Sequence, residues 1–77
     1  MRTSTGHDFI EPAILKILKE SVEAMSTLGI NYRINELAGK VINLNVVRNH
    51  LMFLVKSRKV SERLDSDNGV TYYKLLA

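Results

Sequence analysis

The sequence predicts a small α+β domain with three helices, a short strand and a C-terminal β-hairpin. Apolar residues recur at helical spacing in the segments before Val60, and they alternate with polar residues after it. The turn pair Asn68-Gly69 divides the alternating region into two runs. A chain of 77 residues forms one small domain. We place that domain at residues 8–77, after a polar and flexible N-terminal arm at residues 1–7.

The first helix is predicted to begin between residues 8 and 12 and to end at Gly29. Asp8 and Glu11 have the spacing of a capping box, and Pro12 favours the first turn. The apolar stripe of this helix consists of Ile14, Leu18, Val22 and Met25. A second apolar row makes the arc wider than one core contact needs. That row consists of Ile10, Ile17, Ala24 and Leu28.

Residues 30–34 alternate apolar and polar side chains, which predicts a short strand that pairs with the C-terminal hairpin. Asn35 is then in position to cap a short helix over residues 36–41. Residues 42–44 have no helical period with this segment, so we interpret them as a turn.

The third helix is predicted over residues 46–58, with Asn45 as its N-cap. Its buried face is predicted to contain Val47, Leu51 and Leu54. His50 follows this buried line, and we interpret it as a partly buried, hydrogen-bonded structural residue rather than a catalytic or metal-binding one. Met52 and Phe53 lie toward the outer side of the helix. They either cover the rim of the core or form a surface for a partner.

The hairpin is predicted from two alternating runs, residues 59–65 and 70–76, joined by a four-residue tip. In this order the segments INYRINELA, VVRNHLMFLVKSRKVSER and NGVTYYKL resemble parts of winged helix-turn-helix proteins. They are similar, in that order, to the strand and positioning helix, to the recognition helix and exit strand, and to the return strand of the wing. The resemblance covers nearly the whole chain. The relatives in question are arsenic-repressor-like transcriptional regulators and small winged-helix proteins of archaeal viruses and plasmids.

The sequence departs from that family's pattern in three places. The glycine that is usual in the turn between the two helices is missing, and Ile42-Asn43 stands there. The wing tip carries Asp65 and Asp67, where basic residues are commoner. The long flanking helices that dimerise many relatives are absent.

The composition favours a DNA-binding role over an enzyme. The net charge of +3 and the pI of about 9.5 are compatible with a polyanionic partner. There is no cysteine, the two histidines are far apart, and no catalytic or nucleotide-binding motif occurs. We therefore expect no enzyme activity, no cofactor and no metal, and no small-molecule effector is evident from the sequence. No apolar run is long enough for a membrane span, and we expect a cytoplasmic protein.

The resemblance implies double-stranded DNA as the partner, with the N-terminal half of the third helix in the major groove. Asparagine can bond adenine, arginine can bond guanine, and valine can touch a thymine methyl group. The candidate base contacts are Asn45, Val46, Arg48 and Asn49. Asn45 has the alternative interpretation of a plain N-cap. The candidate phosphate contacts are Arg33, Lys40, Lys56, Arg58, Lys59 and Arg63.

The second apolar row of the first helix predicts a homodimer, because no other element of this short chain is expected to cover it. The predicted interface consists of Ile10, Ile17, Ala24 and Leu28. Alternatively, the N-terminal arm or the back of the hairpin covers these residues and the protein is a monomer. Two functions therefore remain open: a dimeric DNA-binding regulator, and a winged-helix module that binds proteins without touching DNA. The polar face of the third helix favours the first function, and the acidic wing and exposed hydrophobic residues favour the second.

Overall fold

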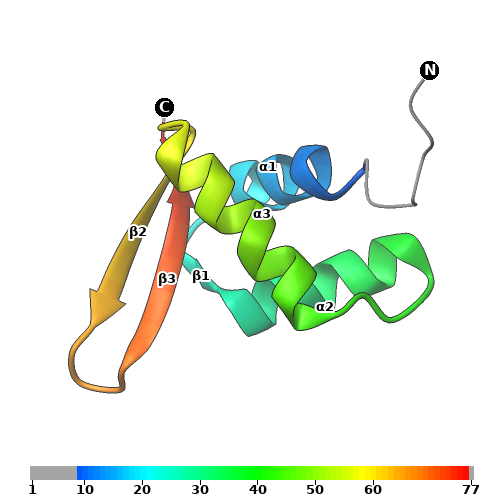
Figure 1. Ribbon diagram of the computed structural model, residues 1–77. Helices are drawn as coiled ribbons and strands as arrows, with labels where there is room; N and C mark the ends of the chain where they lie inside the picture. The colour runs from blue at the N-terminus through cyan, green and yellow to red at the C-terminus, as the bar shows by residue number, and fades with distance from the viewer. Residues whose placement is uncertain (1–8, 77) are drawn as a thin grey trace.

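The computed structural model describes residues 9–76. Over this range the elements follow in the order α1 (Ile10–Glu20), β1 (Met25–Ser26), α2 (Thr27–Ala38), α3 (Leu44–Lys56), β2 (Val60–Asp65) and β3 (Val70–Leu75) (Figure 1). The predicted α+β architecture of three helices and a C-terminal hairpin is confirmed. The predicted arm at residues 1–7 and the proposed cap Asp8 lie outside the described residues.

Helix α1 is shorter than predicted, because it ends at Glu20 rather than at Gly29. The chain then runs in extended form, exposes 88% of Val22, and pairs Met25 and Ser26 with the hairpin. Ser26 is also the N-cap of α2, since its hydroxyl accepts a hydrogen bond from the Gly29 backbone N–H at 3.2 Å. The helical spacing of apolar residues therefore continues in the sequence although the helix itself is interrupted. The pairing of β1 with β3 and the cap at Ser26 cause the interruption.

The predicted strand at residues 30–34 is wrong, because these residues form the middle of α2. Ile30 and Ile34 are both fully buried, and their four-residue spacing suits one face of a helix as well as one face of a strand. Tyr32 lies between them and is 65% exposed. Helix α2 ends at Gly39, whose φ of 69° is the left-handed conformation typical of a helix C-terminus.

Three asparagines fix the connection between α2 and α3. The Asn31 side-chain amide donates to the Ile42 carbonyl at 3.0 Å, and the Asn35 side-chain oxygen accepts from the Ile42 N–H at 2.7 Å. The Asn43 side chain caps α3 by accepting from the Asn45 N–H at 2.7 Å. The predicted caps Asn35 and Asn45 are therefore wrong, because both residues lie inside helices.

A glycine does lie between α2 and α3, although the sequence analysis found none in the turn. Gly39 occupies the first position after α2, three residues before Ile42. The helix predicted over residues 36–41 runs through this glycine, so the predicted turn at residues 42–44 comes too late in the chain. The connection therefore resembles the usual winged-helix pattern more closely than the sequence suggested.

The sheet is antiparallel with the strand order β1-β3-β2. The hairpin register pairs Val60 with Leu75 and Asp65 with Val70, which confirms the predicted runs and their four-residue tip. The third strand is β1, whose Met25 pairs with Tyr73. Residues near Tyr32 do not take part in the sheet described here.

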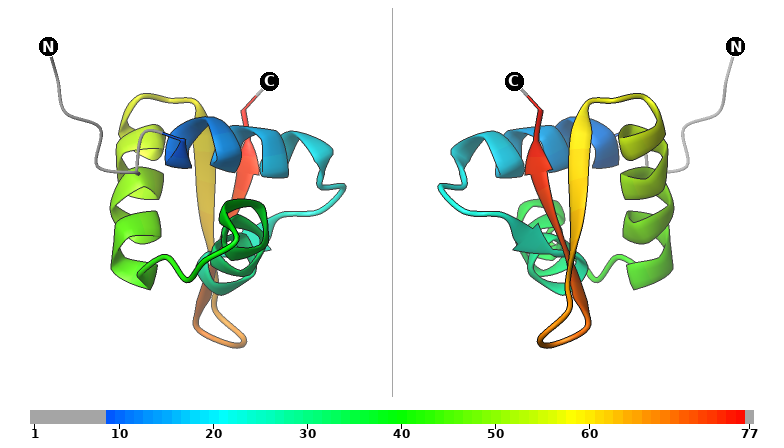
Figure 2. Two further views of the ribbon diagram at one scale, coloured as in Figure 1. Left: turned by 90° about the vertical axis from the view of Figure 1, so that its right-hand side faces the viewer. Right: turned by 90° about the vertical axis from the view of Figure 1, so that its left-hand side faces the viewer.

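The hydrophobic core lies between the three helices and the inner face of the sheet. Its buried apolar side chains are Ile10, Ile14, Ile17, Leu18, Ile30, Ile34, Ile42, Val47, Leu51, Leu54, Val60 and Tyr73. Helix α1 packs near the open end of the hairpin, and the hairpin tip projects away from it on the opposite side of the molecule (Figure 2). Within residues 9–76, none of the helices has the length and apolar character needed to cross a membrane.

Candidate nucleic-acid interface

Helix α3 exposes a polar face opposite its core contacts. The predicted buried residues Val47, Leu51 and Leu54 are confirmed in the core. Asn45, Arg48 and Asn49 are exposed on the first two turns of the helix. Val46, the fourth candidate base contact, is half-buried and packs against the core, so its side chain is less available to a ligand.

The position of α3 is fixed at both its beginning and its middle. Asn43 caps the N-terminus, and the preceding Ile42 is held by two side chains of α2. In the middle of the helix, His50 Nδ1 lies 3.0 Å from Glu11 Oε2 of α1. The prediction that His50 is a partly buried, hydrogen-bonded structural residue is confirmed. Glu11 therefore connects α1 to α3 in the described structure.

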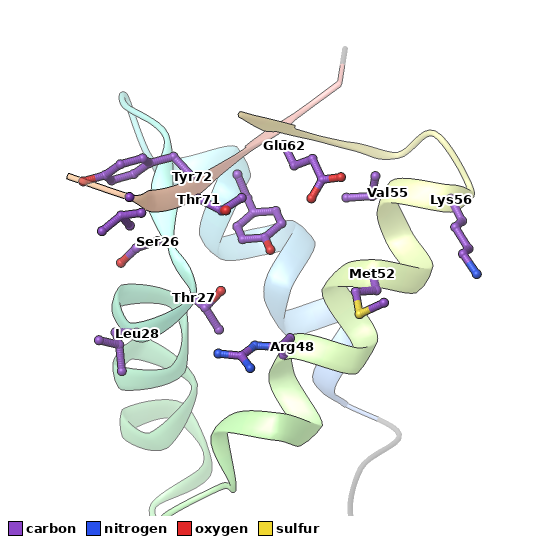
Figure 3. A pocket seen from close by; sticks show the side chains of 13 residues that line it. Ser26, Thr27, Leu28, Arg48, Met52, Val55, Lys56, Glu62, Thr71 and Tyr72 are labelled. Carbon is purple, nitrogen blue, oxygen red and sulfur yellow. The ribbon is translucent and has the colours of Figure 1, made fainter. Parts of the chain in front are cut away.

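A groove of about 710 Å³ runs beside α3, and we call it the α3 groove. Its walls are α3, the start of α2 and the hairpin (Figure 3). Arg48, Met52 and Lys56 line it from α3. In Figure 3 the Arg48 guanidinium points across the groove toward Thr27 at the start of α2. The groove thus brings one side of α3 next to the N-terminus of α2.

The groove presents hydrogen-bond donors and positive charge to one side of α3. Arg48 and Lys56 contribute two cations, and Glu62 contributes one carboxylate from β2. Thr27 adds a hydroxyl group. The backbone N–H groups at the beginning of α2 favour anions, because the helix dipole places partial positive charge there. This combination of groups is chemically suited to contact with a phosphate backbone.

The sequence did not predict that Thr27, Leu28 and Tyr72 line this groove. Thr27 and Leu28 were expected in the last turn of the first helix, and Tyr72 was expected only as a strand residue. The signal that could have located the start of α2 is Ser26, because serine followed by a helical period is a typical N-cap.

The six candidate phosphate contacts are all exposed, but they do not form one surface. Lys56 lines the α3 groove. Arg33 lies on α2, with Nε 3.9 Å from Glu36 Oε1 one turn further along the same helix. Lys40 follows Gly39 in the connection between α2 and α3. These three cations lie on or near the helix-turn-helix unit.

The other three cations lie elsewhere. Arg63 lines a hollow on the other side of the hairpin, together with Tyr72 and Lys74. Arg58 and Lys59 follow the C-terminus of α3, whereas the candidate base contacts lie on its first two turns. A helix of 13 residues is about 20 Å long. Arg58 and Lys59 are therefore far from the part of α3 that would enter a major groove.

For two of its four residues, the predicted dimer interface is not supported by the structure. Ile10 and Ile17 are 0% and 1% exposed in the single chain, because they pack in the core. They need no second copy to cover them. Ala24 is half-buried in the segment after α1, and Leu28 is 68% exposed on α2. The four residues do not share one helix face, since α1 ends at Glu20.

The hairpin tip is closed by its own side chains and is acidic. Asp65 Oδ1 accepts from the Asp67 N–H at 2.9 Å, and Asn68 Oδ1 accepts from the Val70 N–H at 2.9 Å. The Asn68 amide also donates to the Tyr72 hydroxyl at 3.1 Å. Two carboxylates at the tip repel phosphate, so the tip itself is a poor contact for DNA. Among the described residues, no cluster of three or more His, Cys, Asp or Glu side chains could hold a metal ion.

Solved structures provide the comparison that decides the fold. The Helicobacter pylori ferric uptake regulator Fur, a protein with three functional metal-binding sites, superposes with a TM-score of 0.80 at 24% identity over 87% of this chain. A protein of the hsRosR-S4 complex superposes with a TM-score of 0.75 at 28% identity over 90% of this chain. The chain adopts the winged-helix fold.

This winged-helix chain corresponds to only part of each of those proteins. It covers 44% of the Fur chain and 56% of the RosR chain, so it spans about half of their length. No model of a known protein family matches the sequence. A search of curated proteins finds no match either.

Proposed function

We propose that this protein is a transcriptional regulator that binds specific sequences of double-stranded DNA with α3. The observation that supports this most is the exposed polar surface of the first two turns, formed by Asn45, Arg48 and Asn49 beside the α3 groove. Asparagine amides and arginine guanidinium groups match the donor and acceptor patterns of adenine and guanine in the major groove. The winged-helix fold that it shares with Fur and RosR supports the same role.

In the proposed complex, α3 lies in the major groove and cations beside it hold the phosphates. Lys56 and the N-terminus of α2 border the α3 groove and are suited to contact one strand. Arg33 and Lys40 are exposed on the same helix-turn-helix unit and supply further contacts. Arg58 and Lys59 lie outside this proposed interface, because they follow the far end of α3.

We propose that the regulator acts as a homodimer in the cytoplasm, on an inverted repeat whose half-sites lie about 34 Å apart. Its pairing surface is not the row containing Ile10 and Ile17, because those side chains are buried. The resemblance to arsenic-repressor-like regulators and to proteins of archaeal viruses and plasmids stays a prediction about its subgroup.

Selection of bound duplexes from a random DNA pool tests this proposal. We expect enrichment of one short motif, and weaker binding to every duplex as the salt concentration rises. A matched selection with Arg48→Ala should give a motif that has lost preference at one position. A pool that remains random after repeated rounds, with no salt-dependent binding, would contradict the proposal.

The alternative function is a protein-binding module that does not contact DNA. The exposed side chains of Met52 and Phe53 on α3, and the acidic hairpin tip, favour this function. The same selection separates the two, because a protein-binding module would enrich no DNA motif.

A further inference from the structure

A second hollow, of about 580 Å³, lies at the open end of the hairpin, opposite the tip. We call it the basal hollow. Helix α1, the turn between α3 and β2, and the end of β3 form its walls. Its apolar surface comes from Leu15, Leu75 and Leu76. Leu76 is 46% exposed, so this apolar surface is accessible in the single chain.

The basal hollow is also strongly positive. Lys16 and Lys19 line it from α1, one turn apart, and Arg58 and Lys59 line it from the turn after α3. No carboxylate lines the hollow among the described residues. None of the four cations forms an ion pair with a carboxylate that the structure describes. More than a third of the eleven lysines and arginines of the chain thus gather around three leucines.

The turn that carries two of these cations is held by backbone hydrogen bonds and is conformationally unusual. Arg58 has a φ of 62°, in the left-handed region where glycine is favoured. Its N–H donates to the Val55 carbonyl at 3.0 Å, and the Lys59 N–H donates to the Leu54 carbonyl at 3.0 Å. The Lys59 carbonyl accepts from the Leu76 N–H at 3.0 Å, which joins the turn to the end of β3. An arginine at a position that suits glycine adds positive charge to the hollow at the expense of backbone strain.

We propose that the basal hollow binds an acidic, amphipathic segment of a partner protein. Four cations around an apolar centre complement a peptide that carries Asp or Glu beside Leu or Phe. DNA fits less well, because its backbone presents mainly charged phosphates and little apolar surface to cover the leucines. A membrane surface fits less well, because the leucines lie in a hollow rather than on a protruding face. The hollow lies beyond the C-terminus of α3, so a partner could bind there while the N-terminus of α3 contacts DNA.

The test uses the full chain and a synthetic amphipathic peptide of about 15 residues that alternates acidic and leucine or phenylalanine positions. We expect micromolar binding by fluorescence anisotropy, and no binding of a peptide in which Asn and Gln replace the acidic residues. Arg58→Gly should weaken peptide binding about tenfold, because one charge-assisted contact is lost. The same substitution relieves the left-handed strain, so thermal stability should stay equal or rise.

Matched variants separate the basal hollow from general charge. Leu76→Ser removes apolar surface and should also weaken the peptide about tenfold, since one buried leucine side chain is lost from the contact. Lys74→Gln removes one exposed cation outside the hollow and should leave peptide binding unchanged. Affinity of Arg58→Gly for the selected DNA should equal that of the wild type.

Four outcomes would overturn the proposal. The first two concern the peptide: the wild type does not bind it, or Arg58→Gly binds it as well as the wild type does. The third is a loss of DNA affinity in Arg58→Gly, and the fourth is wild-type binding to phosphatidylserine vesicles that Arg58→Gly abolishes. The third outcome would assign the hollow to DNA phosphates, and the fourth would assign it to a membrane surface.

Discussion

Asparagine side chains have different tasks in the part of the chain around α3. Asn31 and Asn35 bond the backbone of Ile42, and Asn43 caps the helix. The side chains of Asn45 and Asn49 are exposed, and they form no hydrogen bond with the residues that the structure describes. The first three therefore stabilise the fold, whereas the last two are available to a ligand. This division separates variants that change stability from variants that change binding.

Asn35→Ala should destabilise the protein, and Asn45→Ala should not. In Asn35→Ala the Ile42 N–H loses its acceptor in a partly buried position, which costs about 1–3 kcal/mol. Asn45 is exposed, so its truncation should stay within about 0.5 kcal/mol. Urea denaturation of the two variants measures the difference. Equal midpoints would show that the bond to Ile42 contributes nothing to stability.

Arg48→Ala and Asn49→Ala should each weaken binding to the selected DNA motif by about 1–3 kcal/mol and relax base preference at one position. Lys56→Ala should weaken all sequences alike, because a phosphate contact reads no sequence. It should also flatten the dependence of log K on log salt by about one unit. Binding titrations at several salt concentrations measure both effects. Wild-type affinity in all three variants would place the DNA contact away from α3.

At the scale of single elements, the sequence predicts best what local residues decide. The two strands of the hairpin and its four-residue tip were predicted correctly, because Asn68-Gly69 specifies a turn independently of the rest of the fold. The buried face of α3 was predicted because three apolar residues set the phase of the helix. That phase also places Arg48 and Asn49 on the exposed side, so part of the candidate site follows from the sequence.

The remaining elements depend on contacts between distant residues. Strand β1 has two residues, and its pairing with β3 decides where α1 ends and α2 begins. No periodicity can appear in a strand of that length, and Ile30 and Ile34 fit a helix and a strand equally well. The α3 groove was missed for the same reason, since it needs the start of α2 in its correct place.

Gly29, inside α2, and Gly39, directly after it, should respond in opposite ways to substitution by alanine. Gly39→Ala should cost about 1–2 kcal/mol, because its φ of 69° is unfavourable for a residue with a Cβ atom. Gly29→Ala should stabilise α2 by up to about 1 kcal/mol, since a Cβ there meets its nearest atoms at 3.5 Å, an ordinary contact. Thermal unfolding measures both changes. A destabilised Gly29→Ala would mean that α2 does not begin at Thr27.

At the scale of the whole molecule, one small core holds all three helices and the sheet together. Ile10, Ile14 and Ile17 bring α1 into that core, and Glu11 connects α1 to α3 through His50. A domain of this size has a free energy of unfolding of about 4–12 kcal/mol. The sequence predicts a dimer from the wide apolar surface of the first helix. The buried residues of that surface are covered by the core of the single chain and need no second copy. Any dimer of this protein must use residues that the single chain leaves exposed.

Ile17→Glu should unfold the protein rather than dissociate a dimer. The side chain is 1% exposed, so the variant loses core packing and buries a carboxylate without a partner. The cost exceeds about 4 kcal/mol, which is comparable with the whole stability of so small a domain. Val22→Glu is the matched control: its side chain is 88% exposed, and it should retain the fold within about 0.5 kcal/mol. Circular dichroism during heating, together with sedimentation, distinguishes the outcomes. A folded, monomeric Ile17→Glu protein beside a dimeric wild type would instead place Ile17 at the dimer interface and refute its assignment to the core.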